Sequence, residues 1–282
     1  MVNSRIINCK FVIVACVCAV LLNVNNVSQT TIRQSRPFAV TFSIPAFTAN
    51  VISLDRKSAR FTHTVQLLQR LQIVSLHVVP PLQDSEVVMR EVRKWNGTLP
   101  GPMSLKLAHF SIWNAFAANN SFLDSDFMLV FEDDIEMSSS VSQQDVVEVI
   151  ESAARLSEYG SGFFYLGLCE PRCELATSQV LKSIVYTDCF GLCSHAYGLF
   201  KWRSKTLQRD LEVFRPRGNL EDDIDQLLFA GFSKSPIFPI LAASNLSDGR
   251  AHLGHVGIFY QDRQSFPTEL FTDKHWLPNY KS

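Results

Sequence analysis

The stretch that most constrains this chain is an apolar run that ends in three consecutive acids, FMLVFEDDIEM at residues 127–137. A continuous apolar run is typical of a strand that is buried on both faces, as in a parallel sheet. Ligands of open α/β sheets bind just beyond the carboxyl ends of such strands, which is where Glu132, Asp133 and Asp134 stand. Three neighbouring carboxylates are costly there unless a cation or a hydrogen-bond donor neutralises them.

Two interpretations of the acidic triplet are open at this point. Its oxygens are ligands of a hard divalent cation that shares the phosphate groups of a substrate. Alternatively, the triplet is a solvated acidic turn after an ordinary core strand.

The surrounding pattern predicts one α/β domain from about residue 37 to residue 282. A strand is expected over 49–54, ending at Asp55-Arg56, then a helix over 58–71 and a strand over 73–79, which is the start of a right-handed βαβ unit. The tail from Asn245 looks irregular. Apolar spacing predicts further helices over 85–95, 104–118, 145–156, 202–214 and from 221 until Gly231 ends the last one. Strands are expected over 162–168 and 237–241, and a strand or an extended segment over 193–199.

The charge balance bears on the class of partner. The chain of 282 residues carries 26 basic and 27 acidic residues, for a formal net charge of -1. A nucleic-acid-binding protein normally shows a basic excess or stripe, so the composition argues against nucleic acid as a partner.

Residues 1–24 have the pattern of a targeting segment. Arg5 and Lys10 precede an uncharged run at 11–24, which is short for a membrane span of about 20 residues and within the length of a signal-peptide core. No clear small-residue cleavage site follows, so an uncleaved signal anchor is favoured over a removed signal peptide and secretion. The charges then predict a single-pass type II protein, with a stem at 25–36 and its body in the lumen of the endoplasmic reticulum or Golgi.

Two further features agree with a lumenal body. Glycosylation sequons stand at Asn26, Asn96, Asn119 and Asn245. Four cysteines form two pairs of matched spacing, Cys169/Cys173 and Cys189/Cys193. In an oxidising compartment they predict two disulfides, with three connectivities open, and a structural zinc site is the rival interpretation.

A second acidic cluster contains Asp222, Asp223 and Asp225 at the expected start of a helix. Carboxylates at a helix N-terminus are favoured by the helix dipole, so a structural role competes with a catalytic one. His252 and His255 lie in the polar tail as candidate metal ligands, although a lone histidine is more often structural or on the surface. His109 faces the apolar side of its helix, where a hydrogen-bonded core histidine is as good a reading as a catalytic one.

Six stretches taken together resemble the family-25 glycosyltransferases, the lipopolysaccharide-type and procollagen galactosyltransferases. They occur in the family's order and span about residues 50–245. Ser53 stands where the family typically has Asn, and Ala108 precedes His109, so the chain resembles a divergent member. The stretches are NVISLDRKSARF, SLKLAHFSIWNAF, MLVFEDDIEM, FFYLGL, HAYGLFKWRSKTL and EDDIDQLLF.

The resemblance implies a GT-A fold: a Rossmann-like mixed sheet flanked by helices, binding a nucleotide sugar and Mn²⁺ or another divalent cation. It implies Asp134 as the direct metal ligand, with Glu132 or Asp133 making a further contact to the metal or the donor. Asp55 and Arg56 then lie where the nucleotide sits. Asp225, with Asp222 and Asp223 as neighbours, matches the catalytic base, and His252 or His255 would complete the metal shell.

The expected function is therefore metal-dependent transfer of a hexose, galactose in the first place, from a UDP-sugar to a hydroxyl group of a protein or glycan. Two alternatives are a non-catalytic, glycan-binding relative of the family and a metal-dependent phosphoester hydrolase. The intact acidic triplet argues against a binding relic, which has no need to keep it.

Overall fold

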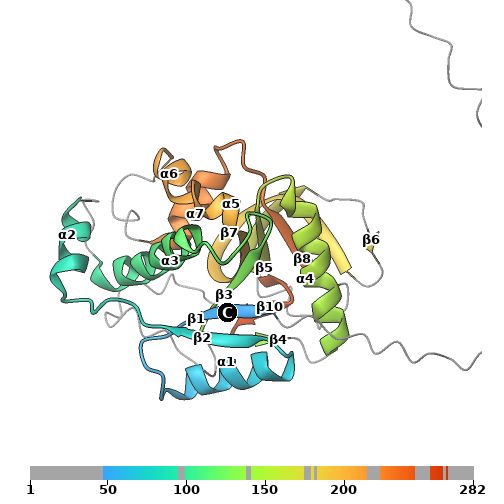
Figure 1. Cartoon of the computed structure of the whole chain (residues 1–282), viewed down its shortest axis with the longest axis horizontal. Helices are drawn as coiled ribbons and strands as arrows, with labels where there is room; N and C mark the ends of the chain where they lie inside the picture. The colour runs from blue at the N-terminus through green and yellow to red at the C-terminus, as the bar shows by residue number, and fades with distance from the viewer. Residues whose placement is uncertain are drawn as a thin grey trace, which may run out of the picture. The chain divides into compact units, whose positions relative to one another are not determined.

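The strand that ends in the acidic triplet lies inside the sheet, as its composition requires. In the computed structural model, β3 (Phe127–Glu132) pairs in parallel with β1 (Thr48–Ile52) and antiparallel with β7 (Ser183–Phe200) (Figure 1). Its central residues are buried on both sides, so the predicted core strand is confirmed.

The structure describes residues 47–94, 99–137, 141–174, 179–180, 183–214, 223–244, 255–262 and 265, all within one compact unit, Ile44–Ser282. Among these residues, none of the helices combines the length and the apolar composition that a membrane crossing requires. Several predictions lie outside the described residues, namely the targeting segment, the stem, Asn26, Asn96, Asp222, Asn245 and His252.

The first three elements form the predicted βαβ unit. β1 leads through α1 (Ala59–Arg70) to β2 (Val74–Val78), which pairs with β1 in parallel. Ser58 is the N-cap of α1, and its hydroxyl accepts a hydrogen bond from Phe61 N at 3.0 Å. This cap fixes the start of α1 just beyond the carboxyl end of β1.

The main sheet is mixed, in the order β2-β1-β3-β7-β8-β5-β9, and β7 also pairs directly with β5. Its second half comprises β5 (Phe163–Glu174), β8 (Ile240–Ser244) and β9 (His255–Gly257), while β6 (Gln179–Val180) pairs with β7. A smaller sheet joins β4 (Ile135–Met137) to β10 (Phe259–Gln261). The expectation of an irregular tail was wrong for residues 255–261, whose backbone groups pair with those of β5 and β4.

Helices cover the sheet, and two of them differ from the prediction. The expected helix over 202–214 is two short helices, because Thr206 leaves helical geometry with φ −122°. Gly231 lies inside the last helix, where a Cβ atom would stand 2.2 Å from Leu211 Cδ2, so this glycine serves helix packing rather than termination. The helices after α1 are α2 (Glu86–Lys94), α3 (Pro100–Ala118), α4 (Gln143–Glu158), α5 (Lys201–Ser204), α6 (Leu207–Glu212) and α7 (Ile224–Phe232).

Alternate residues of β3 enter two different cores. Met128 and Val130 pack into the cluster that contains residues of α3 and α7, whereas Leu129 and Phe131 pack into the cluster with α1 and α4. α1 and α3 accordingly lie on opposite sides of β1 and β3 (Figure 1). The fold is a mixed α/β sheet flanked by helices, which confirms the α/β part of the prediction, and its GT-A-like character stays a prediction.

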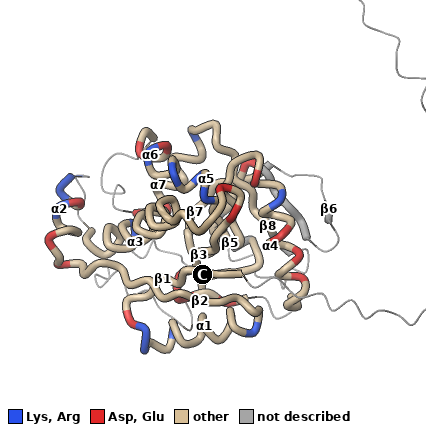
Figure 2. The backbone as a smooth tube through the Cα atoms, in the orientation of Figure 1, with Lys and Arg blue, Asp and Glu red and all other residues tan. Residues whose placement is uncertain are grey.

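The charged residues lie mainly on the outer elements. Figure 2 shows basic and acidic residues interspersed along α2, α4 and α6. Arg60, Asp133 and Asp134 are exceptions, since they are largely withdrawn from water near the carboxyl end of β3.

Candidate functional site

The acidic triplet splits between the two sides of the sheet, and the alternation of β3 explains why. Glu132 continues the series of Met128 and Val130, so its side chain reaches the α3 side. Asp133 takes the opposite side and meets α1, where Thr64 Oγ1 donates to its carbonyl oxygen at 3.0 Å. One strand therefore supplies carboxylates to two environments.

Arg60, in the first turn of α1, joins the two aspartates. Its Nη2 atom lies 3.1 Å from Asp133 Oδ1 and 3.2 Å from Asp134 Oδ2. The Arg60 side chain is 14% exposed, and those of Asp133 and Asp134 are 13% and 5% exposed, so the three charges are largely withdrawn from water. Ser53, at the end of β1, donates to the other oxygen of Asp133 at 2.5 Å. The cation that the triplet needed is supplied within the chain by Arg60.

A pocket of about 40 Å³ opens beside these groups. Its size suits a few water-sized groups, such as an ion with waters. Arg60, Glu132 and Asp133 contribute charged groups to it, and it lies where β1, β2 and β3 end. The lining residues are Ile52, Ser53, Leu54, Arg60, Pro80, Leu105, Glu132 and Asp133.

The predicted nucleotide residues Asp55 and Arg56 lie at the surface in the turn that follows β1. The Asp55 carboxylate accepts a hydrogen bond from Lys57 N at 2.8 Å, which closes this turn. Leu54, next to them in the chain, lines the pocket. The turn thus forms the outer edge of the pocket, and a role of Asp55 or Arg56 in nucleotide binding stays a prediction.

Glu132 is held by neutral donors from two later strands. Ser194 Oγ, in β7, donates to Glu132 Oε1 at 3.0 Å, and Gln261 Nε2, in β10, donates to Glu132 Oε2 at 3.3 Å. Asp262 N also donates to the carbonyl oxygen of Asp134 at 2.8 Å. The C-terminal strand that the sequence did not predict therefore completes the surroundings of the triplet.

A buried polar row lies behind Glu132. Trp113 Nε1 donates to the Tyr197 hydroxyl oxygen at 2.8 Å, and His109 Nδ1 lies 2.8 Å from the same oxygen. The other ring nitrogen of His109, Nε2, lies 3.9 Å from Glu132 Oε1. Burial raises the pKa of Tyr197 and lowers the pKa of His109 to about 3. His109 is a neutral core histidine that lies behind the acids.

This burial predicts a pH dependence of stability. The unfolded chain takes up a proton at His109 below pH 6.5, whereas the folded protein does not until about pH 3. The neutral His109 of the fold therefore costs no stability above pH 6.5. Below that pH the free energy of unfolding decreases, by about 2 kcal/mol between pH 7 and pH 5. Urea unfolding at several pH values of wild type and His109→Gln measures it. The variant should lose this part of the slope, and equal slopes in the two proteins would contradict the pKa.

The second acidic cluster begins α7. Asp223 is the N-cap, and its Oδ1 accepts from Asp225 N at 2.8 Å, so the capping role expected of one of these acids is realised by Asp223. Asp225 lies close enough to Tyr165 that its charge, together with burial as the larger cause, raises the pKa of that phenol well above its usual range. Tyr165 and Tyr197 both pack against Phe163, so the aromatic core connects Asp225 with the row behind Glu132.

The cysteines form two disulfides, Cys169–Cys193 and Cys173–Cys189, across the paired strands β5 and β7. The predicted disulfides are confirmed, and the connectivity is fixed among the three that the sequence left open. They are compatible with an oxidising secretory or extracellular environment.

The outer of the two disulfides along the chain, Cys169–Cys193, lies beside the surroundings of Glu132. Ser194, which follows Cys193, holds Glu132, and Cys193 Sγ lies 3.4 Å from Gln261 Oε1. Because Gly167 has no side chain, the backbone of β10 can lie close to β5. A Cβ atom on residue 167 would lie 2.2 Å from Phe259 O. The disulfide thus fixes β7, which carries the donor Ser194, and it lies beside Gln261 of β10.

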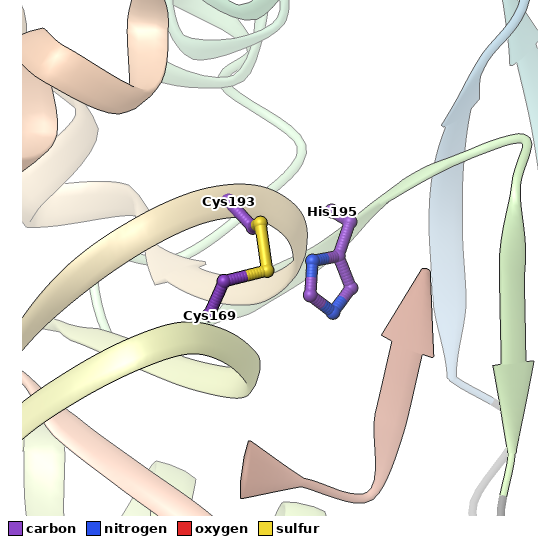
Figure 3. A group of neighbouring side chains, drawn as sticks. All are labelled: Cys169, Cys193 and His195. Atoms are coloured by element: carbon purple, nitrogen blue, oxygen red, sulfur yellow. A yellow bond between two sulfur atoms is a disulfide. The ribbon is translucent and has the colours of Figure 1, made fainter. Parts of the chain in front are cut away.

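One group of three potential metal ligands occurs among the described residues: Cys169, Cys193 and His195. The two sulfurs are bonded to each other, and the His195 ring lies beside that bond (Figure 3). His195 Nε2 lies 3.2 Å from Phe259 O and donates to it. A cysteine binds a metal ion as a thiolate, and these two cysteines are bonded to each other. In this oxidised form the group is therefore structural.

The structure brings together Ser53, Arg60, Asp133 and Asp134, with Glu132 just behind them. His255 lies in β9, paired with Cys169, and its role as a metal ligand stays a prediction. Sequence reasoning missed Arg60, Ser194 and Gln261. For Arg60 a signal existed, since the first turn of a crossover helix stands beside the carboxyl ends of the strands.

Comparison with known proteins leaves the family-25 resemblance as a prediction: no protein-family model matches this chain, and no curated protein matches it at a significant level.

Proposed function

We propose that this protein is a metal-dependent glycosyltransferase of GT-A-like fold that transfers a hexose from a UDP-sugar to a hydroxyl group of a protein or glycan. Galactose is the hexose that the resemblance favours. One observation carries the proposal: two carboxylate oxygens, from Asp133 and Asp134, converge on one positively charged atom at the carboxyl end of β3. Ligands of open α/β sheets bind at this edge.

The donor set fits Mn²⁺ or another hard divalent cation. Such ions are commonly held by one or two carboxylates, and substrate phosphates and waters complete the shell. Asp134 and Asp133 would hold the ion here, with His252 and His255 in the tail as further candidates. When bound, the ion offsets the charge that develops on the departing nucleoside diphosphate.

The chain's own residues position these groups. Ser53 orients Asp133 through its hydrogen bond, and Ser194 and Gln261 hold Glu132 at the back of the pocket. Asp55 and Arg56 stand at the outer edge, where the donor nucleotide would extend from the small pocket across the surface.

Asp225 is the proposed general base, which takes the proton from the acceptor hydroxyl as it attacks. It is half-buried in the first turn of α7, beside Tyr165. Asp223 supports it by capping the helix, and Asp222 precedes the two in the sequence.

One observation favours the non-catalytic alternative, in which the protein binds a glycan without transferring sugar. Arg60 already lies between Asp133 and Asp134 and partly neutralises them, so the pair has a structural use without a metal ion. The experiment below separates the two functions, because a binding protein releases no UDP.

The test is a panel of UDP-sugars offered to the purified full chain, with Mn²⁺ or with EDTA, and with UDP release as the readout. We expect release with UDP-galactose above the other donors, and its loss in EDTA. If no donor yields UDP with Mn²⁺, the proposed function is wrong.

We propose further that the protein acts in the lumen of the endoplasmic reticulum or Golgi as a type II membrane protein. The two disulfides support an oxidising compartment, and the targeting segment at 1–24 would supply the anchor. Its substrates would then be proteins and glycans of the secretory pathway.

Asn119 gives a test of this location. It is exposed at the C-terminal end of α3, and its side chain accepts from Ser121 N at 2.9 Å, so a glycan there has room. After expression in secretory cells, Asn119→Gln should run faster on a gel than wild type by one glycan, and glycosidase treatment should remove the difference. Asn114→Gln, an exposed helical asparagine outside any sequon, is the control. Equal mobility of all three proteins would contradict modification at Asn119.

A further inference from the structure

Arg60 occupies an unusual position within the proposed site. One of its nitrogens lies between oxygens of two different aspartates, at 3.1 Å and 3.2 Å, and the same side chain lines the pocket. Charge-assisted contacts of this kind are among the stronger hydrogen bonds in proteins. Arg60 therefore stands at the point where a cation between Asp133 and Asp134 would also stand.

The charges of these three side chains show what a metal ion would change. Two carboxylates and one guanidinium sum to −1, so the guanidinium only partly neutralises the pair. A divalent cation on both carboxylates would neutralise them fully and would take the place of the Arg60 guanidinium on these oxygens. His63 Nε2, one turn further along α1, lies 2.9 Å from Glu136 Oε2 of β4, so that carboxylate has a contact of its own with α1.

The position of Arg60 in the fold allows its head group to move while its backbone stays. Ser58 caps α1 two residues earlier, and Phe61, the next residue, is buried in the core. The guanidinium needs only side-chain rotation to turn from the carboxylates into the pocket that it already lines. Its planar fork suits phosphate oxygens as well as carboxylates.

We propose that Arg60 is an exchangeable counter-cation: a divalent cation replaces it on Asp133 and Asp134, and the released guanidinium binds the diphosphate of the donor. The inference rests on the proposed function and assigns to Arg60 a role in positioning the donor. It implies that Arg60 opposes metal binding when no nucleotide is present and favours nucleotide binding once the metal is bound.

The test measures Mn²⁺ binding by electron paramagnetic resonance and UDP binding by calorimetry, on the full chain. Arg60→Gln is compared with wild type and with Arg70→Gln, which removes an exposed charge at the far end of the same helix. Without nucleotide, Arg60→Gln should bind Mn²⁺ about tenfold more tightly than the other two proteins. With saturating Mn²⁺, it should bind UDP about tenfold more weakly.

Unchanged or weaker Mn²⁺ binding in folded Arg60→Gln would overturn the exchange, and so would the absence of Mn²⁺ binding in all three proteins. If Arg60→Gln does not fold, a crystal structure of wild type with Mn²⁺ and UDP decides. Arg60 should then contact a phosphate oxygen, and Arg60 still on both aspartates would overturn the proposal.

The two proposals fail in different ways. If wild type turns over no UDP-sugar but Arg60→Gln still binds Mn²⁺ more tightly, the proposed function is wrong and the exchange stands. If UDP is released while Mn²⁺ affinity is the same in all three proteins, the function stands and the exchange is wrong.

Discussion

Asp134→Asn should lower Mn²⁺-dependent release of UDP from a UDP-sugar by a factor on the order of 10³, since a metal ion's stabilisation of the transition state amounts to several kcal/mol. The amide keeps the shape of the side chain but loses the charge that a divalent cation requires. Arg60 keeps Asp133 as a partner, so the folded structure should survive the change. The measurement is a UDP-release assay at saturating donor, together with a thermal melt.

Asp124→Asn is the matched control. Asp124 precedes β3 in the chain, has an exposed side chain, and pairs with Lys205 at 2.6 Å, so it shares the chemistry of Asp134 without its location. Its turnover should equal that of wild type. Unaltered turnover in Asp134→Asn would show that the metal assignment is wrong, whatever the donor.

Removing the outer disulfide, with Cys169→Ala and Cys193→Ala together, should lower the free energy of unfolding by about 3 kcal/mol. The bond closes a segment with a sequence separation of 24, and its loss frees the unfolded chain. Because Ser194 and Gln261 hold Glu132 beside this bond, UDP release should fall as well. Urea unfolding and the UDP-release assay measure the two effects.

The inner disulfide, Cys173–Cys189, provides the comparison for both effects. Cys173→Ala with Cys189→Ala removes a similar bond, of sequence separation 16, that joins β5 and β7 further from Glu132. It should cost a similar amount of stability, about 3 kcal/mol, and leave the activity of the folded protein near that of wild type. Equal loss of activity in the two double variants would contradict a specific link between the outer bond and the acid site.

The sequence predicts the elements that depend on local pattern. The strand before the triplet and the βαβ start follow from apolar periodicity, and the structure confirms them. The position of the triplet at the carboxyl end of the parallel strands is predicted too, because it depends only on where β3 ends. The pairing of four cysteines into two bonds needs only an oxidising compartment.

What the sequence does not predict depends on tertiary contacts. The contact of Arg60 with both aspartates requires the exact placement of α1 against β3. β9 and β10 are each three residues long and gain their structure from the strands that they pair with, so their own pattern is weak. The division of the triplet between Arg60 and the Ser194–Gln261 donors depends likewise on where α1, β7 and β10 lie in the fold.

The alternation of β3 restricts how the length of this strand can vary in evolution. Inserting or deleting one residue between Phe127 and the triplet would move Glu132 to the α1 side and Asp133 to the buried row with His109. Inserting or deleting two residues would leave each acid on its present side of the sheet. Length variants that keep the site should therefore differ by even steps, and an odd step would have to be offset by a bulge in the same strand.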